Sequence, residues 1–304
     1  EFYNFIVNRR IESVKEVFME YITLNNGVKI PQLGFGVYQV PKEECERCVL
    51  DAIKAGYRHI DTAQSYFNEA EVGDAVSKCG VPREDLFITS KVWIDNYGYE
   101  KTRKSVLASI EKLKSGYIDL MVIHLPFADY YGAYRALEDL YKEGKIRAVG
   151  VSNFAPDRLA DIAQFNEIKP AVDQVEINVF NQQKTALDNM EKRGIHAEAW
   201  APFGEGKNGI FTNPTLTAIA AAHKKSVAQV ILRWLVQRGV IALAKSLRAD
   251  RMAENIAVFD FELTAAEMEE IAALDTGKSL FFDHRAPETV DWFADLIVKR
   301  RQLL

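Results

Sequence analysis

The sequence predicts an α/β protein: a (β/α)8 TIM barrel with an N-terminal β-hairpin plug and extra C-terminal helices. Eight short, largely apolar runs typical of β-strands alternate along the chain with amphipathic segments of helical length. Such alternation implies right-handed β-α-β units and a parallel sheet, and eight units in succession suit a closed barrel. The predicted strands are Leu33–Val37, His59–Asp61, Phe87–Lys91, Leu120–His124, Ala148–Val151, Val172–Glu176, His196–Trp200 and Ile241–Ala244.

A hairpin is expected ahead of the barrel and helices around and after it. Asn26-Gly27, flanked by alternating apolar residues between Tyr21 and Ile30, is typical of a tight β-turn. This pair of strands would plug the bottom of the barrel. The predicted helices include Lys42–Ala55, Asn68–Cys79, Glu100–Leu113, Tyr131–Glu143, Pro156–Phe165, Lys184–Lys192, Ala249–Ala257 and Thr264–Leu274, and an aromatic-rich tail runs from Gly277 to Leu304.

An open, doubly wound sheet is the competing architecture. That fold carries a G-x-G-x-x-G turn between its first strand and helix. Gly34-Phe35-Gly36 lacks the third glycine and continues into Val37-Tyr38-Gln39-Val40, which is not a helix start. The barrel is therefore preferred, as one domain over residues 19–304. Residues 1–18 are interpreted as a leader or a cloning-derived extension, with Met19 as the natural start.

Composition excludes several classes of function. The 304 residues are 48% hydrophobic and 27% charged, and a formal net charge of −5 leaves no basic excess for a nucleic-acid partner. No apolar run approaches the length of a membrane span, so we expect no membrane partner. The chain is also expected to be a monomer. Three cysteines indicate a reducing, cytoplasmic compartment. Cys45 and Cys48 share one predicted helix without a second pair, so no metal site is expected.

Four polar side chains fall at the carboxyl ends of neighbouring predicted strands, where a β/α barrel carries its active site. Asp61 ends the second strand, and Tyr66 lies in the loop after it. Lys91 ends the third strand and His124 the fourth. A lysine that ends a buried strand needs a partner, because burying an unpaired charge is very costly. Asp61 on the adjacent strand is the expected partner.

This group suits the protonation of an oxygen on which negative charge develops. A phenol has a reference pKa of about 10, and a cationic Lys91 beside Tyr66 is expected to lower that pKa. A neutral His124 can donate a hydrogen bond to the substrate oxygen. Hydride arriving at a carbonyl carbon creates such a charge, so we expect reduction of a carbonyl by a hydride-carrying cofactor.

A second polar cluster follows the last predicted strand. Lys245, Arg248 and Arg251 place three cations just past that strand and around the start of the next helix. Phosphate groups bind well at helix amino termini, and phosphate sites recur after the last strands of β/α barrels. A solvated, charged helix surface is the alternative reading of the same residues.

Four separated motifs resemble the aldo-keto reductase family. The resemblance extends from about Leu24 to Trp292, with the motifs in the same order, and the chain is most similar to bacterial-type members. The motifs are Gly56-Tyr57-Arg58-His59-Ile60-Asp61-Thr62-Ala63 with Tyr66, Ile88-Thr89-Ser90-Lys91-Val92-Trp93, Gly150-Val151-Ser152-Asn153-Phe154, and the stretch from Lys245-Ser246 to Glu254-Asn255.

The resemblance implies a barrel reductase that uses NADPH/NADP+ without a metal. It assigns catalysis to Asp61, Tyr66 as the acid, Lys91 and His124. The cofactor residues that it implies, with Arg248 added from the cation cluster, are Ser152, Asn153 and Gln174 at the nicotinamide amide, Trp200 on the ring, Lys245, Ser246, Arg248 and Arg251 near the 2′-phosphate, and Glu254 and Asn255 at the adenine.

The walls of a substrate pocket are expected around the same rim. Leu125 stands where bacterial relatives often carry Trp, and the loop after it is short, so small aldehydes, α-keto-aldehydes or keto-sugars are the expected substrates. Trp93 follows Lys91 by two residues and would face the same side of the strand. The candidate walls are Val37, Tyr38, Trp93, His124, Leu125 and Phe127, and Phe281, Phe282 and His284 of the tail are candidates to cap the opening.

Two other functions stay open. A non-catalytic, nucleotide-sensing or structural member of the same fold would need no turnover, although all four catalytic residue types are intact. A hydrolase would use paired carboxylates such as Asp61 and Glu176, but Asp61 is already needed by Lys91.

Overall fold

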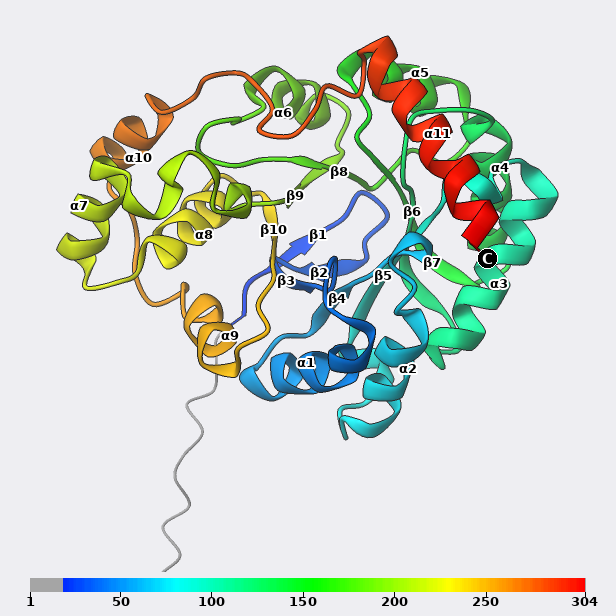
Figure 1. Ribbon diagram of the computed structural model, residues 1–304, viewed down its shortest axis with the longest axis horizontal. Helices are drawn as coiled ribbons and strands as arrows, with labels where there is room; N and C mark the ends of the chain where they lie inside the picture. The colour runs from blue at the N-terminus through cyan, green and yellow to red at the C-terminus, as the bar shows by residue number, and fades with distance from the viewer. Residues whose placement is uncertain (1–18, 304) are drawn as a thin grey trace, which may run out of the picture.

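The computed structural model describes residues 19–303, with side chains as far as residue 299, so the extension predicted at residues 1–18 lies outside the described residues. Its centre is a closed barrel of eight parallel strands, which confirms the predicted (β/α)8 fold (Figure 1). The barrel strands are β3 (Leu33–Gly36), β4 (His59–Asp61), β5 (Phe87–Val92), β6 (Ile118–Ile123), β7 (Ile146–Ser152), β8 (Val172–Glu176), β9 (His196–Trp200) and β10 (Ile241–Ala244). Around the barrel they follow in chain order, and β10 closes the ring by pairing with β3.

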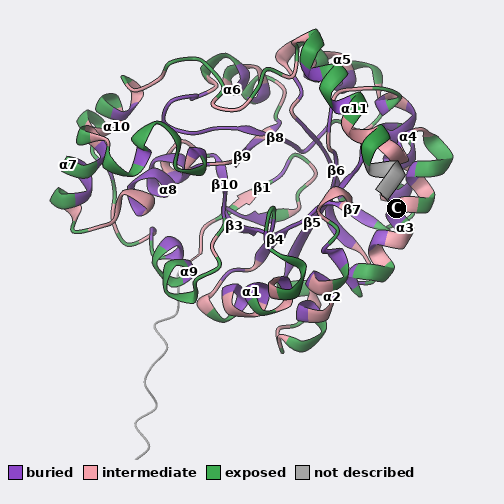
Figure 2. Ribbon diagram, viewed as in Figure 1, coloured by how far each residue is buried: buried purple, intermediate pink, exposed green. Residues whose placement is uncertain are grey.

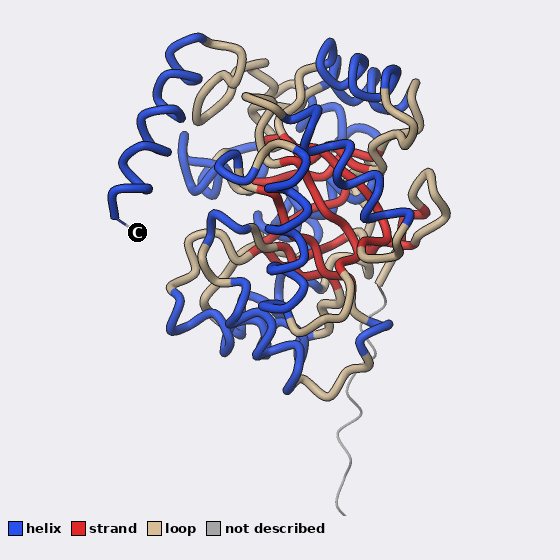
Figure 3. The backbone as a smooth tube through the Cα atoms, turned by 90° about the vertical axis from the view of Figure 1, so that its right-hand side faces the viewer, coloured by secondary structure: helices blue, strands red, loops and turns tan. Residues whose placement is uncertain are grey.

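Helices enclose the barrel on all sides (Figure 3). They present buried faces to the strands and exposed faces to solvent, as the alternating colours of Figure 2 show. Some ends follow from local chemistry: Ser226 and Gln229 form a reciprocal capping box at the start of α8. The helices are α1 (Lys42–Ala55), α2 (Glu69–Lys78), α3 (Tyr99–Leu113), α4 (Tyr130–Lys142), α5 (Pro156–Phe165), α6 (Lys184–Glu191), α7 (Pro214–His223), α8 (Val227–Gln237), α9 (Ala249–Ile256), α10 (Ala265–Ala272) and α11 (Pro287–Leu303), with short 3₁₀ segments η1 (Gln64–Tyr66), η2 (Arg83–Asp85), η3 (Ile94–Asn96) and η4 (Gly204–Thr212).

The predicted hairpin is present and closes one end of the barrel. β1 (Tyr21–Thr23) and β2 (Lys29–Pro31) pair antiparallel, and Gly27 takes the left-handed conformation at their turn, with φ of 84°. Leu24 and Ile30 belong to an apolar cluster with side chains of the barrel strands. Those partners include Phe87, Leu120, Val122, Val172 and Ile241. The hairpin therefore seals the end opposite to the candidate site.

Above this apolar layer the barrel interior is polar. Alternation along the strands points His59 and Asp61 inward from β4 and Glu198 inward from β9, and all three are almost fully buried. Room for the His59 ring comes from Gly34, because a Cβ there would lie 2.6 Å from Nδ1 of His59. A buried layer of titratable groups thus lies below the strand ends.

The aromatic tail covers one side of the barrel mouth. The strap, which comprises residues 277–286, crosses from α10 towards α11 (Figure 1), and the C-terminal end of α11 lies at the outer edge of the molecule (Figure 3). Phe293 of α11 packs with Trp93 and Leu125 in a small apolar cluster of its own. In the described part of the chain, no helix is both long and apolar enough to cross a membrane.

Candidate active site

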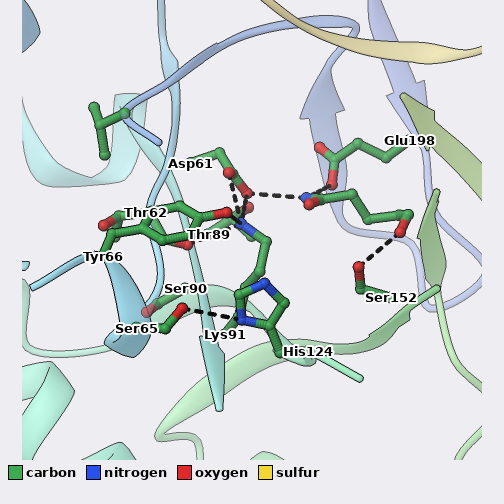
Figure 4. A network of polar contacts seen from close by, with 12 residues as sticks. Asp61, Thr62, Ser65, Tyr66, Thr89, Ser90, Lys91, His124, Ser152 and Glu198 are labelled. Atoms are coloured by element: carbon green, nitrogen blue, oxygen red, sulfur yellow. Dashed lines mark hydrogen bonds and ion pairs between the residues drawn. The ribbon is translucent and has the colours of Figure 1, made fainter. Parts of the chain in front are cut away.

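Lys91 and Asp61 meet at the carboxyl ends of β5 and β4. The ammonium nitrogen of Lys91 lies 2.6 Å from Oδ1 and 2.8 Å from Oδ2 of Asp61, and it also donates to the carbonyl oxygen of Thr62 at 3.0 Å. The phenol oxygen of Tyr66 is 3.3 Å from the same nitrogen (Figure 4). The structure therefore brings together three of the four side chains to which sequence reasoning assigned the chemistry.

The electrostatics of this group correct one expectation. Burial alone lowers the pKa of Lys91, but Asp61, Tyr66 and Glu198 outweigh it and raise that pKa above its usual value, so the lysine is cationic. Lys91 lowers the pKa of Tyr66, as expected, but the net shift is upward. Burial of the phenol outweighs the opposing effect of Lys91, and the Asp61 carboxylate adds to the rise, which brings the pKa of Tyr66 to about 12. Tyr66 therefore keeps its proton at neutral pH.

His124 completes the group from the end of β6. Its backbone N–H donates to the carbonyl oxygen of Val92, and its Nδ1 lies 3.5 Å from Oγ of Ser65. Its ring centroid is 5.9 Å from that of Tyr66 and 5.2 Å from that of Trp93. The imidazole and the phenol thus border the same side of the mouth, and a carbonyl oxygen placed there can contact both.

The candidate nicotinamide residues form a connected hydrogen-bond cluster. Oγ of Ser152 donates to the carbonyl oxygen of Gln174 at 2.7 Å and accepts from Nδ2 of Asn153 at 3.0 Å. Asn153, in the left-handed conformation with φ of 64°, also accepts from the indole N–H of Trp200 at 2.9 Å. Nε2 of Gln174 donates to Oδ2 of Asp61 at 3.0 Å, which ties this cluster to the Lys91 pair. The amide oxygen of Gln174 makes no hydrogen bond with any described residue, so an acceptor is available there.

The cation cluster surrounds the start of α9. Lys245 and Arg251 are exposed and form no ion pair with any described residue. Arg248 differs, because its guanidinium pairs with the carboxylate of Asp250. The side chain of Asn255 is nearly buried, and its amide makes no hydrogen bond within the described chain. Two uncommitted cations beside an uncommitted amide fit a phosphate that is attached to a base.

Some of the predicted pocket residues border the mouth of the barrel, and one lies in the core instead. Tyr38 is 53% exposed and its ring lies 5.0 Å from that of Tyr66, so it borders the mouth. Trp93 and Leu125 border the mouth from the other side, under Phe293. Val37, in contrast, is fully buried in the main core cluster and exposes no surface to a substrate.

A cavity of about 830 Å³ lies beneath the strap, between the carboxyl ends of β7 and β8. Asn153, Trp200 and Glu176 are among its lining residues. Glu176 holds the strap, since its carboxylate accepts from the hydroxyl of Ser279 and from the backbone N–H of Leu280. Phe281 lies on Trp200, with ring centroids 5.3 Å apart. Of the predicted tail caps, Phe282 and His284 pack on Phe293, and Phe281 covers the side of the mouth where Trp200 lies.

Two residues of the site escaped sequence reasoning. Glu198 is fully buried, and its only signal was a carboxylate flanked by alanines inside a predicted strand. Phe293 lies in a tail that periodicity could not place over the mouth. The carboxylate pair of a hydrolase is not supported by the contacts, because Asp61 is bound to Lys91 and Glu176 to the strap. Among the described residues, no group of three or more His, Cys, Asp or Glu side chains is arranged to hold a metal.

Comparison with known proteins matches this chain to one protein family. The sequence model of the Aldo/keto reductase family matches residues 32–276. The glyoxal reductase of Bacillus subtilis is 48% identical over 256 residues, which cover 84% of this chain and 92% of that protein. The morphine 6-dehydrogenase of Pseudomonas putida is 40% identical over 290 residues, 91% of this chain and 98% of that protein.

Solved structures agree with the sequence matches. An aldo/keto reductase from Brucella melitensis superposes with a TM-score of 0.82 at 39% identity and covers 85% of this chain and 100% of its own. A Bombyx mori aldo-keto reductase in complex with NADP has a TM-score of 0.83 at 34% identity and covers 86% and 95%.

Proposed function

Since the chain belongs to the aldo/keto reductase family, we propose that it reduces aldehyde or ketone groups to alcohols with Tyr66 as the proton donor. The chain is an NADP-dependent oxidoreductase, like the relatives that it matches. The assignment of Tyr66 as the acid rests on one observation. Its phenol oxygen lies 3.3 Å from the buried ammonium group of Lys91, which Asp61 holds in place.

The residues divide the chemistry between them. When bound, the nicotinamide supplies a hydride to the carbonyl carbon. Tyr66 gives its proton to the carbonyl oxygen, and Lys91 stabilises the phenolate that remains, because its charge faces the phenol oxygen. His124 donates a hydrogen bond to the same carbonyl oxygen and orients it towards the phenol. Asp61 keeps Lys91 charged and fixed.

The cofactor would lie across the mouth from Gln174 to α9. The free amide oxygen of Gln174 and the hydroxyl of Ser152 suit a carboxamide, and the indole ring of Trp200 offers a flat face to a planar ring. Lys245 and Arg251 would hold the 2′-phosphate, with Ser246 and Arg248 beside them and with Glu254 and Asn255 towards the adenine. The unpaired state of Lys245 and Arg251 among the described residues supports this placement.

Small aldehydes and α-keto-aldehydes are the substrates that the pocket favours. Trp93, Leu125 and Phe293 narrow the mouth on one side, and the ring of Tyr38 borders the other. The similarity to a glyoxal reductase points to the same class. Keto-sugars come next, since a solved relative is described as a putative 2,5-diketo-D-gluconic acid reductase.

The Tyr66→Phe variant tests the proposal. Loss of a general acid costs typically about 10²- to 10⁴-fold in rate, so NADPH oxidation with methylglyoxal should fall by that factor while NADPH binding, followed by fluorescence, stays the same. Tyr21→Phe on the hairpin, a tyrosine far from the site, serves as the matched control. Full turnover by Tyr66→Phe would refute the acid assignment.

A substrate panel separates the catalytic reading from the regulatory one. Methylglyoxal, a nitrobenzaldehyde, a keto-sugar acid and a steroid ketone cover the relevant sizes. Turnover of the first two supports the proposed class. NADPH binding with no turnover across the whole panel would instead support a nucleotide-sensing role.

A further inference from the structure

A second buried carboxyl group lies directly beside the Lys91 and Asp61 pair. Glu198 projects inward from the middle of β9 and is fully buried (Figure 4). Nε2 of Gln174 donates to Oε2 of Glu198 at 2.7 Å and to Oδ2 of Asp61 at 3.0 Å. One amide group thus bridges two carboxyl groups from opposite sides of the barrel interior.

We propose that Glu198 is a positioning residue for carbonyl reduction, which stays protonated at neutral pH, fixes the side-chain amide of Gln174 and through it braces the carboxylate of Asp61. This inference rests on the proposed function, in which Asp61 holds Lys91 beside Tyr66. The side chain of Glu198 hydrogen-bonds to Gln174 and not directly to the phenol of Tyr66, so its effect on the reaction passes through Gln174 and Asp61.

The orientation of the Gln174 amide follows from its two acceptors. An ionised Asp61 can only accept hydrogen bonds, so a reversed amide would place two oxygens 3.0 Å apart without a proton between them. Glu198 uses the second N–H of the same amide. Both N–H groups are then committed, and the amide oxygen of Gln174 is left as the acceptor at the cofactor side of the cluster.

The charge balance of the interior favours a neutral Glu198. The groups that face it are Asp61 and His59 from β4 and Lys91 from β5, while β10 contributes apolar side chains and β3 contributes Gly34. Lys91 is already neutralised by Asp61. Burial and the charge of Lys91 lower the pKa of His59 to about 3, although the Pro31 carbonyl opposes the change, so His59 supplies no cation. An ionised Glu198 would therefore leave an excess negative charge in a site that is buried from solvent.

The surroundings of Glu198 also raise the pKa of its carboxyl group. Burial and the Asp61 carboxylate raise its pKa to about 8, against the opposing effects of Gln174 and Lys91. Oε1 of Glu198 has no hydrogen-bond partner in the described chain and lies 3.6 Å from Nε2 of His59. A proton on Oε1 would face that nitrogen, which also lies 3.0 Å from Oγ1 of Thr89.

Ionisation of Glu198 is expected to slow the reaction. A new negative charge next to Asp61 disfavours further negative charge near Lys91, and both the phenolate of Tyr66 and the developing alkoxide are negative. The rate of reduction should therefore fall as the pH rises through the pKa of Glu198.

Two variants test this inference through the pH profile of kcat, measured with saturating NADPH and methylglyoxal. Glu198→Gln keeps the shape and the neutral charge of the protonated acid, so it should retain most of the wild-type kcat at pH 6 and lack the fall in rate near pH 8. Glu198→Ala removes the support of Gln174, so its kcat should drop at least tenfold at every pH while the KM for methylglyoxal changes little. Glu167→Gln, on the exposed surface, is the control.

The outcomes are distinct. If Glu198→Gln keeps the wild-type kcat at pH 6 while Glu198→Ala does not, and if the fall in kcat near pH 8 is absent from Glu198→Gln, Glu198 acts as a neutral positioning residue. An unchanged limb in Glu198→Gln, or a loss of kcat at pH 6 as large as that of Glu198→Ala, would overturn the inference.

A stability measurement tests the same proton without any turnover. A carboxyl group whose pKa is raised by folding stabilises the native state while it is protonated, and that contribution is lost as the pH rises from the unfolded value towards the folded one. The melting temperature of Glu198→Gln relative to wild type should therefore rise between pH 5 and pH 8 and then level off. A constant difference would show that Glu198 is ionised throughout. Because this result needs no substrate, an inactive wild type would refute the proposed function and leave the proton assignment tested separately.

Discussion

The carboxylate oxygens of Asp61 lie 2.6 Å and 2.8 Å from the ammonium nitrogen of Lys91, and both residues are at most 3% exposed. Removing one partner leaves an uncompensated charge, so Lys91→Met should lower the free energy of unfolding by about 3–5 kcal/mol. The double variant Lys91→Met/Asp61→Leu removes both charges and should recover most of that loss in urea denaturation. Neither variant should reduce methylglyoxal, because both lack the cation beside Tyr66.

If the double variant were as unstable as the single one, the cost would come from packing and not from the unpaired carboxylate. Turnover by Lys91→Met would contradict the role of the lysine.

Arg251 should decide the preference for NADPH over NADH. It is exposed and unpaired among the described residues at the start of α9, and a hydrogen bond to a charged group contributes about 1.5–3 kcal/mol. Arg251→Ala should therefore weaken NADPH binding about 10- to 100-fold and leave NADH binding nearly unchanged, as measured by fluorescence titration. Arg248→Ala should have a smaller effect, because that guanidinium already pairs with Asp250. An equal loss of affinity for both cofactors would remove Arg251 from the 2′-phosphate site.

Glu176 should control how firmly the strap is held. Its carboxylate accepts hydrogen bonds from Asn178, Ser279 and Leu280, and a hydrogen bond to a charged group contributes about 1.5–3 kcal/mol. In Glu176→Ala, trypsin should cleave at Lys278 and Arg285 well before the barrel unfolds, and the fragments can be identified by mass spectrometry. Glu191→Ala, an exposed residue of nearby α6, should digest like wild type. Unchanged cleavage in Glu176→Ala would show that the aromatic contacts of the strap hold it without this anchor.

Much of the barrel follows from local patterns. Periods of two and of 3.6 residues locate the strands and helices, and most observed ends differ from the predicted ones by at most two residues. Where a strand runs past its predicted end, the cause is tertiary: β5 ends one residue later, at Val92, and β7 one residue later, at Ser152, because the neighbouring strands offer partners there. The catalytic candidates could also be predicted from local patterns. A barrel brings the carboxyl ends of all its strands to one rim, so the position of a residue along its strand is enough to place Asp61, Lys91 and His124 together.

By itself the sequence determined the order of the elements and the chemical groups at the rim, because both depend on short-range spacing. Only the tertiary structure decided the charge state and the covering of the site. The pKa of Tyr66 rises although the nearby Lys91 lowers it as predicted, because burial, which no local pattern encodes, outweighs that cation. Gln174 joins Asp61 across 113 positions of the chain, and Ser279 joins Glu176 across 103. Contacts between residues so far apart arise only when the barrel closes and the tail folds back over its mouth.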